Sequence, residues 1–173
     1  MNFSYTYEQQ AIFDLSGQIL SEGAPAARPL EIENAEGPRV DPTLWAQLGE
    51  AGLVGLAVPE AYDGGGCGFV EAAGVMEQIG KTTAPVPFFE TVVLGAMAIE
   101  AFGSEKLKKA ILPEVAAGQR ILTAALVEAE SSIAKPSTRA SREGDGWKLD
   151  GAKAFVPAAE IADQILVSAT TAE

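Results

Sequence analysis

The side chains that could do chemistry in this sequence are carboxylates, because none of its 173 residues is a histidine. Without histidine, the chain can form neither a Ser–His nor a Cys–His nucleophile pair, nor a His-rich zinc or iron site. Glu128 and Glu130 lie two apart on an expected strand, so their side chains should share one face. Such a pair can act as general acid and base, although in an acidic protein it more often faces water or an arginine. Chemistry would therefore come from carboxylates, from a cofactor, or from residues outside this chain.

A glycine-rich loop at residues 64–68 raises the question of phosphate binding. Dinucleotide-binding loops carry G-x-G-x-x-G between a strand and a helix, so that main-chain N–H groups meet the pyrophosphate. Gly64 and Gly66 fit that spacing, but Phe69 stands at the third glycine position. We therefore expect a tight connection between two elements. Cys67, the single cysteine, has no histidine to activate it and is expected to be a free structural thiol.

Composition and charge limit the kinds of molecule that the protein is expected to bind. The chain has 24 acidic and 12 basic residues, a formal net charge of −12, which repels nucleic-acid backbones and anionic membrane surfaces. The one basic cluster, Lys106, Lys108 and Lys109, is typical of the solvated face of a helix. A single cysteine fits a reducing compartment, the N-terminus has no signal-peptide pattern, and the apolar run 92–99 is too short to span a membrane. We expect a cytoplasmic protein that binds neither nucleic acid nor membrane.

The elements that would position these residues begin with helices. Thr6 and Gln9 match a capping box, and the apolar residues after them recur on one face: Ile12, Leu15 and Ile19. Residues 23–40, rich in Pro, Gly, Ala and Glu, are predicted to be a loop. Asp41-Pro42 then predicts a helix start, with an apolar stripe of Leu44, Trp45 and Leu48.

Three further helices are expected after a short buried segment at residues 53–58, which is either a strand or irregular. They run from about 69 to 79 with Gly80 as the C-cap, from about 90 to 102, and from Ser104 to near Pro113. The second of these is apolar nearly all round, which predicts a buried position.

Alternating patterns replace helical spacing from residue 121 onward. Residues 121–127 are predicted to be a strand, glycine-containing turns lie at 144–146 and 150–151, and another strand opens at 165. We count three or four strands with no partner for the last one, which would leave an unpaired sheet edge. The prediction is an α+β protein, with an all-α domain at residues 1–120 and an incomplete β-domain at 121–173.

Several motifs together resemble a known family. Residues 44–60, LWAQLGEAGLVGLAVPE, are similar to the acyl-CoA dehydrogenase signature W-x-x-L-G-x-x-G-L-x-G-L-x-V-P-E, and YDGGG at 62–66 is similar to the Y-G-G-x-G that follows it. Four more blocks follow in the family's order: EQIG at 77–80, FGSEKLK at 102–108, LP at 112–113 and GDGWKLDGAK at 144–153. Each block alone is weakly specific, but their order and spacing make the resemblance fairly specific over nearly the whole chain.

The resemblance implies a helical N-terminal domain, a middle β-barrel and a C-terminal four-helix domain, of which this chain would hold the first and the start of the second. It implies FAD-dependent α,β-dehydrogenation of an acyl-CoA thioester, with electron-transfer flavoprotein as a partner and a homo- or hetero-oligomeric enzyme. The family's glutamate base normally lies in the C-terminal domain, so no catalytic residue is assigned here, and no metal is implied.

The resemblance also places the cofactor contacts. The family strand that ends A-x-T-E-P-x-x-G-S-D corresponds to ALVEAESSIA at 125–134, which implies flavin contacts from Leu126, Val127 and Ser132 and a substrate contact from Ile133. The family motif K-x-W/F-I-T corresponds to KAFVP at 153–157, which implies flavin contacts from Phe155, Val156 and Pro157.

Both segments depart from the family pattern. Valine replaces the threonine at position 127, and Ile133 and Ala134 replace the family's serine and aspartate. Pro157 replaces a second threonine and offers neither a hydroxyl nor an N–H. These departures leave four interpretations open: part of an FAD-dependent acyl-CoA dehydrogenase, a non-catalytic or half-site subunit of a hetero-oligomer, a same-fold flavin monooxygenase or nitroalkane-type oxidase, and a scaffold without redox chemistry.

Overall fold

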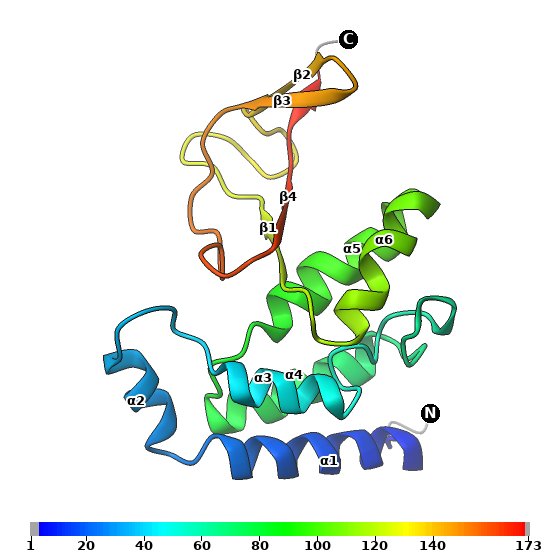
Figure 1. Ribbon diagram of the computed structural model, residues 1–173, viewed down its shortest axis with the longest axis vertical. Helices are drawn as coiled ribbons and strands as arrows, with labels where there is room; N and C mark the ends of the chain where they lie inside the picture. Colours follow the sequence, from blue (N-terminus) through cyan, green and yellow to red (C-terminus); the bar gives the residue numbers. More distant parts are fainter. Residues whose placement is uncertain (1–3, 172–173) are drawn as a thin grey trace.

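The computed structural model describes residues 4–171, which form helices followed by two small sheets. The helical elements are α1 (Tyr7–Gly23), α2 (Arg28–Asn34), α3 (Pro42–Glu50), the 3-10 turn η1 (Glu60–Tyr62), α4 (Phe69–Thr82), the π-helix η2 (Phe89–Ala96), α5 (Met97–Phe102) and α6 (Glu105–Ala116). The strands are β1 (Leu122–Ala125), β2 (Arg139–Glu143), β3 (Gly146–Asp150), β4 (Gln164–Val167) and β5 (Thr170–Thr171). Figure 1 shows α1 at one end of the molecule and the β2–β3 hairpin at the other. The α+β prediction is confirmed.

The first helix begins where its capping box predicts. The Thr6 hydroxyl accepts from Gln9 N at 3.1 Å, and Gln9 Oε1 accepts from Thr6 N at 2.9 Å. Two residues of its predicted apolar face, Ile12 and Ile19, are partly buried against the core. Leu15 is 44% exposed, however, and the fully buried residues are Phe13, Ser16 and Leu20. The face turns because the Phe13 ring lies against Gly74 of α4, where any β-carbon would collide with it.

The loop predicted at residues 23–40 contains a helix, so that part of the prediction was wrong. α2 has proline in its first turn and buries Ile32 against the core. An ion pair holds α2 to the N-cap of α3, with Arg28 Nε 2.7 Å from Asp41 Oδ2. α2 has only seven residues and is stabilised by one long-range ion pair and one buried side chain. So short a helix shows little hydrophobic periodicity in the sequence, which is why it was not predicted.

The start of α3 is confirmed. Asp41 Oδ1 accepts from the N–H groups of Thr43 and Leu44, both at 3.1 Å. The predicted stripe of this helix is buried: Leu44, Trp45 and Leu48. The segment 53–58 that follows is buried and irregular.

The glycine-rich loop at 64–68 is a tight connection, as predicted. Its main-chain N–H groups donate to carbonyls of the irregular segment, from Gly65 to Gly55 at 3.0 Å, from Gly66 to Val58 at 2.8 Å and from Cys67 to Leu56 at 2.8 Å. A β-carbon at Gly64 would collide with the Val58 carbonyl. The N–H groups that a phosphate would need are therefore already bonded within the fold.

Helix ends differ from prediction in three places. α4 continues past Gly80 to Thr82 and ends at Thr83, whose φ is 50°. The helix expected at 90–102 is a π-helix, η2, followed by α5. α6 begins at its Ser104 cap but runs through Pro113 to Ala116.

The apolar helix η2 is buried, as expected, and carries the β-domain on its flank. The Thr91 hydroxyl accepts from Leu122 N at 3.3 Å and donates to Leu122 O at 3.4 Å. Gly95 lies against the Leu122 side chain with no room for a β-carbon. β1, whose four residues are all buried, is therefore anchored on the helical core.

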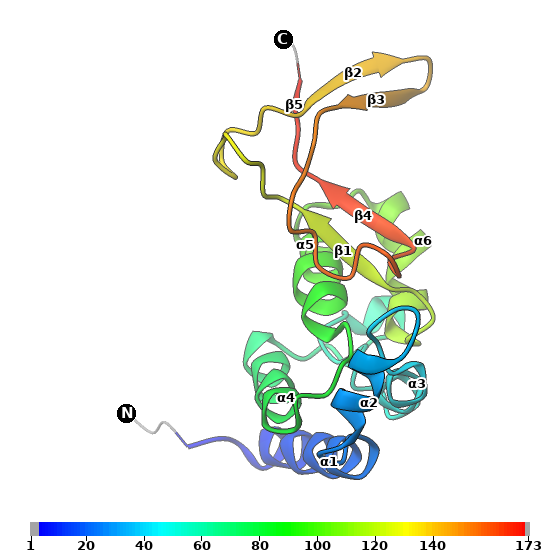
Figure 2. The same ribbon diagram turned by 90° about the vertical axis from the view of Figure 1, so that its left-hand side faces the viewer.

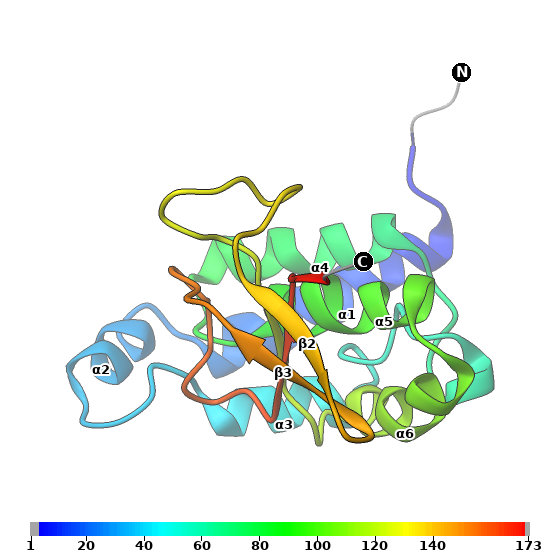
Figure 3. The same ribbon diagram turned by 90° about the horizontal axis from the view of Figure 1, so that it is seen from above.

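The observed strand pairing contradicts the prediction that the last strand has no partner. β4 is not unpaired, because it runs parallel to β1 with Leu122 opposite Gln164 and Ala125 opposite Val167. β2 and β3 form a hairpin around the predicted turn at 144–146, and β5 pairs with β2 in parallel. Figure 2 shows β1 and β4 side by side beyond α5, and Figure 3 shows the hairpin crossing above the helices. β1 and β4 are parallel and lie some forty residues apart in the sequence, so no short turn connects them. The sequence therefore contains no turn pattern that would indicate their pairing.

Candidate functional site

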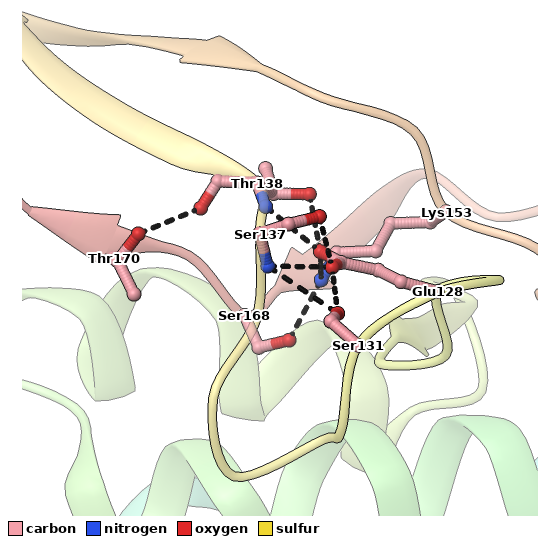
Figure 4. A network of polar contacts seen from close by, with 7 residues as sticks. All are labelled: Glu128, Ser131, Ser137, Thr138, Lys153, Ser168 and Thr170. Atoms are coloured by element: carbon pink, nitrogen blue, oxygen red, sulfur yellow. Dashed lines mark hydrogen bonds and ion pairs between the residues drawn. The ribbon is translucent and has the colours of Figure 1, made fainter.

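A buried polar network lies where β1 leaves the helical core, centred on the Glu128 carboxylate (Figure 4). Lys153 Nζ lies 2.7 Å from Glu128 Oε1, and the two side chains are only 8% and 4% exposed. Oε1 also accepts from the Thr138 N–H at 3.0 Å and from its hydroxyl at 2.6 Å. Oε2 accepts from the Ser137 N–H and hydroxyl, both at 2.6 Å, and from the Ser131 hydroxyl. Each carboxylate oxygen thus has three donors.

These donors fix the ionisation state of the network. The hydrogen-bonded Lys153 ammonium, followed by the hydroxyls of Ser131, Ser137 and Thr138, holds the pKa of Glu128 far below its ordinary range. The geometry also disfavours Glu128 as a general base, because both oxygens of this buried carboxylate are already occupied by donors. Its chemical role is to neutralise a buried lysine and to bind the chain segments around it.

The expected pairing of Glu128 with Glu130 is wrong. β1 ends at Ala125, so neither glutamate lies on a strand. Glu128 turns inward to Lys153, whereas Glu130 is exposed. The two carboxylates therefore have different surroundings and share no acid–base site.

The network brings together the two segments in which the cofactor contacts were predicted. Beside the Glu128–Lys153 pair, the Ala154 N–H donates to the Val127 carbonyl at 2.9 Å. Lys153 Nζ also donates to the Ser168 hydroxyl at 2.9 Å, and Thr170 N donates to Thr138 O at 2.9 Å. Segments 126–138, 153–157 and 168–170 meet at this point, which motif spacing alone did not reveal.

The predicted contact residues line the outer side of these segments. Phe155 is 90% exposed, Ile133 is 56% exposed and Val127 is 38% exposed. Ser132 is also exposed, whereas three of the predicted residues are half-buried: Leu126, Val156 and Pro157. Their main chains share one region, but Ser132 and Ile133 lie on a separate turn closed by Lys135 N donating to Ser132 O at 2.9 Å.

The donors of this region differ in whether they are already bonded within the protein. Within residues 4–171, the N–H groups of Leu126 and Val127 donate to no protein acceptor. In contrast, the hydroxyls of Ser131, Ser137 and Thr138 all donate to Glu128.

No group of three or more His, Cys, Asp or Glu side chains in residues 4–171 is placed to hold a metal ion. None of the helices described there is long and apolar enough to cross a membrane. Burial, followed by the nearby Glu71 and Glu8 carboxylates, raises the pKa of the Cys67 thiol, which opposes a reactive thiolate.

The helical domain, the strand anchored on η2 and the joined segments beyond it define a class of protein. Residues 6–119 match the family described as acyl-CoA dehydrogenase, N-terminal domain. Over 171 residues, 99% of this chain, the sequence is 33% identical to acyl-CoA dehydrogenase FadE27 of Mycobacterium tuberculosis strain H37Rv and covers 45% of that protein. This chain belongs to the acyl-CoA dehydrogenase family, and it spans less than half the length of such curated relatives.

Solved structures agree with this assignment. A variant of the Tcur3481-Tcur3483 steroid ACAD is 40% identical with a TM-score of 0.88, over 95% of this chain and 45% of that one. The ChsE4-ChsE5 complex from Mycobacterium tuberculosis is 33% identical with a TM-score of 0.89, over 99% of this chain and 46% of its own. An FAD-dependent dehydrogenase is 30% identical with a TM-score of 0.78, over 99% of this chain and 44% of its own.

Proposed function

We propose that the complete protein containing this chain takes part in the FAD-dependent α,β-dehydrogenation of an acyl-CoA thioester. Family membership supports this reaction, and a solved relative is described as an FAD-dependent dehydrogenase. Residues 1–120 would form the helical domain and 121–173 the start of the β-domain. The bound flavin would supply the hydride acceptor, and electron-transfer flavoprotein would remove the electrons afterwards.

In this proposal, the chain's own residues orient the flavin ring and exclude water from one side of it. The free N–H groups of Leu126 and Val127 would donate to the ring edge, and Phe155, with Val156 and Pro157, would cover it. Ser132 and Ile133 would contribute at the rim of the site, toward cofactor and substrate respectively. The α-proton would be removed by a base outside this chain, because the family's glutamate normally lies in the C-terminal domain and Glu128 is already paired with Lys153.

A second candidate is a half-site subunit of a hetero-oligomer, and one observation favours it. The hydroxyls of Ser131, Ser137 and Thr138 are bonded to Glu128, and Val127 and Pro157 supply none. A partner subunit would then hold the phosphates. Two similar structures are described by paired names, the ChsE4-ChsE5 complex and the Tcur3481-Tcur3483 ACAD, which supports an assembly of this kind.

Flavin stoichiometry separates the two candidates. We would purify the complete protein alone and together with candidate family subunits, and measure flavin absorbance per chain. One flavin per chain in the protein alone would support an ordinary dehydrogenase; clearly less than one, rising when a second subunit is present, would support the half-site subunit. Protein that stays colourless in every combination would exclude both.

The reaction itself is tested by anaerobic reduction. Flavin bound to the complete protein or assembly should bleach on addition of a suitable acyl-CoA thioester, and an acyl panel should include straight, branched and steroid thioesters. The steroid member is included because one similar structure is described as a steroid ACAD. A flavin that stays oxidised with every thioester but is reduced by a nicotinamide cofactor would favour the monooxygenase alternative.

A further inference from the structure

Residues 153–157 form an arch whose two ends are bonded to different parts of the protein. At the first end, Lys153 pairs with Glu128, and Ala154 N donates to Val127 O at 2.9 Å. At the other end, the Thr123 hydroxyl donates to the Pro157 carbonyl at 2.7 Å. Between these bonds the Phe155 side chain is 90% exposed. The 153–157 arch therefore projects one aromatic ring from two fixed ends.

The main chain at the top of the arch has an unfavourable conformation. Phe155 has a φ of 51°, in the left-handed region that residues with a β-carbon rarely occupy. Its exposed ring has too little protein contact to hold that conformation. Such a conformation persists only where the surrounding structure enforces it. Here the hydrogen bonds and the ion pair at the two ends of the arch enforce it.

Both ends of the arch are attached to well-anchored parts of the structure. Thr123 is fully buried in β1, the strand that packs on η2 of the helical core. Lys153 is bonded to Glu128 and, through Ser168, to the segment that leaves β4. Glu128 in turn is held by Ser137 and Thr138 at the entry to β2. Figure 4 shows the Lys153 and Glu128 side chains meeting beside Ser137 and Thr138.

We propose that Lys153, Glu128 and Thr123 are positioning residues, which hold the 153–157 arch so that Phe155 presents its ring outward to a planar aromatic ligand. The pair also adds no net charge at the first end of the arch, because the ammonium and the carboxylate neutralise each other. The identity of that ligand as flavin rests on the proposed function. The restraint of the arch does not, and it can be measured without any cofactor.

The restraint is tested by hydrogen exchange of the Ala154 amide in the complete protein, with no flavin added. Lys153→Met should accelerate exchange at Ala154 by about tenfold or more, because the first end of the arch is released. Lys153→Arg, which keeps the charge, should restore most of the protection. The matched control is Lys148→Met on the exposed strand β3, which should leave Ala154 unchanged. Unchanged Ala154 exchange in Lys153→Met would overturn the proposal.

A second variant covers the case in which Lys153→Met fails to fold. Thr123→Val keeps the shape of a buried side chain and removes only the donor to Pro157. Exchange should then increase at the hydrogen-bonded Ala154 amide of the arch, while α1 and α4 remain protected. Equal acceleration throughout the β-domain would contradict a role specific to the arch.

The consequence for the ligand is tested by the visible spectrum of bound flavin. Lys153→Met should shift the flavin bands in the same direction as Phe155→Leu, and Lys153→Arg should not. An altered exchange rate with an unshifted spectrum would overturn the ligand-facing role of Phe155. Protein that binds no flavin in any assembly would count against the proposed function, and the exchange experiment would then decide the restraint alone.

Discussion

The helical part of the molecule and the segments around Glu128 are held together by different forces. Nearly all residues of the continuous buried cluster come from the helices and their connections, among them Leu20, Leu48, Val75 and Phe88. Beyond β1, the exposed strands β2 and β3 bury almost nothing, and the chain is held by strand pairing and by an ion pair with its hydroxyl and N–H donors. The first region depends on apolar area, whereas the second depends on a few directional contacts.

The largest effect should follow a cavity in the helical core. Phe88 is fully buried, so Phe88→Ala should lower the free energy of unfolding by about 3–5 kcal/mol. Denaturant titration of the protein measures this loss. Phe102→Ala is the matched control, because Phe102 is 90% exposed and its loss should change stability by less than about 0.5 kcal/mol. Similar losses from the two variants would contradict the position of the core.

A smaller and more local effect should follow removal of the Glu128 charge. Glu128→Gln leaves Lys153 buried without its counter-ion and replaces acceptor oxygens with an amide, so residues 128–138 should be cleaved by protease about tenfold faster or more. Helices α1 and α4 should remain resistant. Glu130→Gln is the control, since Glu130 is exposed. Loss of helical protection in Glu128→Gln would show that the two regions do not differ as described.

The difference between the regions also explains what the sequence could predict. Helix starts were found at Thr6, Asp41 and Ser104, because a cap is formed by residues only a few positions apart. The buried role of η2 followed from its composition. The pairing of β1 with β4 and the inward turn of Glu128 were missed, because each depends on residues 25 or more positions away.

The candidate site was predictable only in part, and for the same reason. Family resemblance placed contacts in 126–133 and 155–157, and the structure joins these segments through Val127 and Ala154. No local pattern indicated that Ser131, Ser137 and Thr138 would all bond to Glu128. The sequence offered one indication of this network, which is that Glu128 and Lys153 are charged residues in segments rich in apolar or small residues.

The cap of α3 should have an intermediate effect that depends on pH. Asp41→Ala removes the acceptor for Thr43 and Leu44 and the partner of Arg28, which should cost about 1–2 kcal/mol at neutral pH. Burial raises the pKa of Asp41, but the bonds from Arg28, Leu44 and Thr43 outweigh it and lower the pKa overall. The stabilisation is therefore complete above the ordinary aspartate pKa of about 3.9 and is lost as pH falls through the lowered value.

Stability measured as a function of pH checks the sign. The difference between the wild-type protein and Asp41→Ala should be constant near neutral pH and shrink toward zero in strong acid. Asp14→Ala, on the exposed side of α1, serves as the control. A difference that grows as pH falls would mean that Asp41 is destabilised as an anion, against the geometry of its cap.

The smallest effect should have the opposite sign and comes from the top of the arch. Phe155→Gly removes the β-carbon from a residue with φ of 51° and loses little buried area, so it should stabilise the protein by about 0.5–1 kcal/mol. Ala158→Gly relieves the same kind of conformation at φ of 53° and should stabilise to a similar extent.

The two glycine variants should differ only where the ring matters. Both should raise the denaturation midpoint, but Phe155→Gly alone should weaken flavin binding in the assembled protein, because it removes the exposed aromatic side chain. If Phe155→Gly proves stabilising and binds flavin as well as Ala158→Gly does, the strain at position 155 has no connection with the cofactor. If Phe155→Gly proves destabilising, the ring packs against a part of the protein outside residues 4–171, and the contrast between a core-stabilised and a bond-stabilised region would need that contact added.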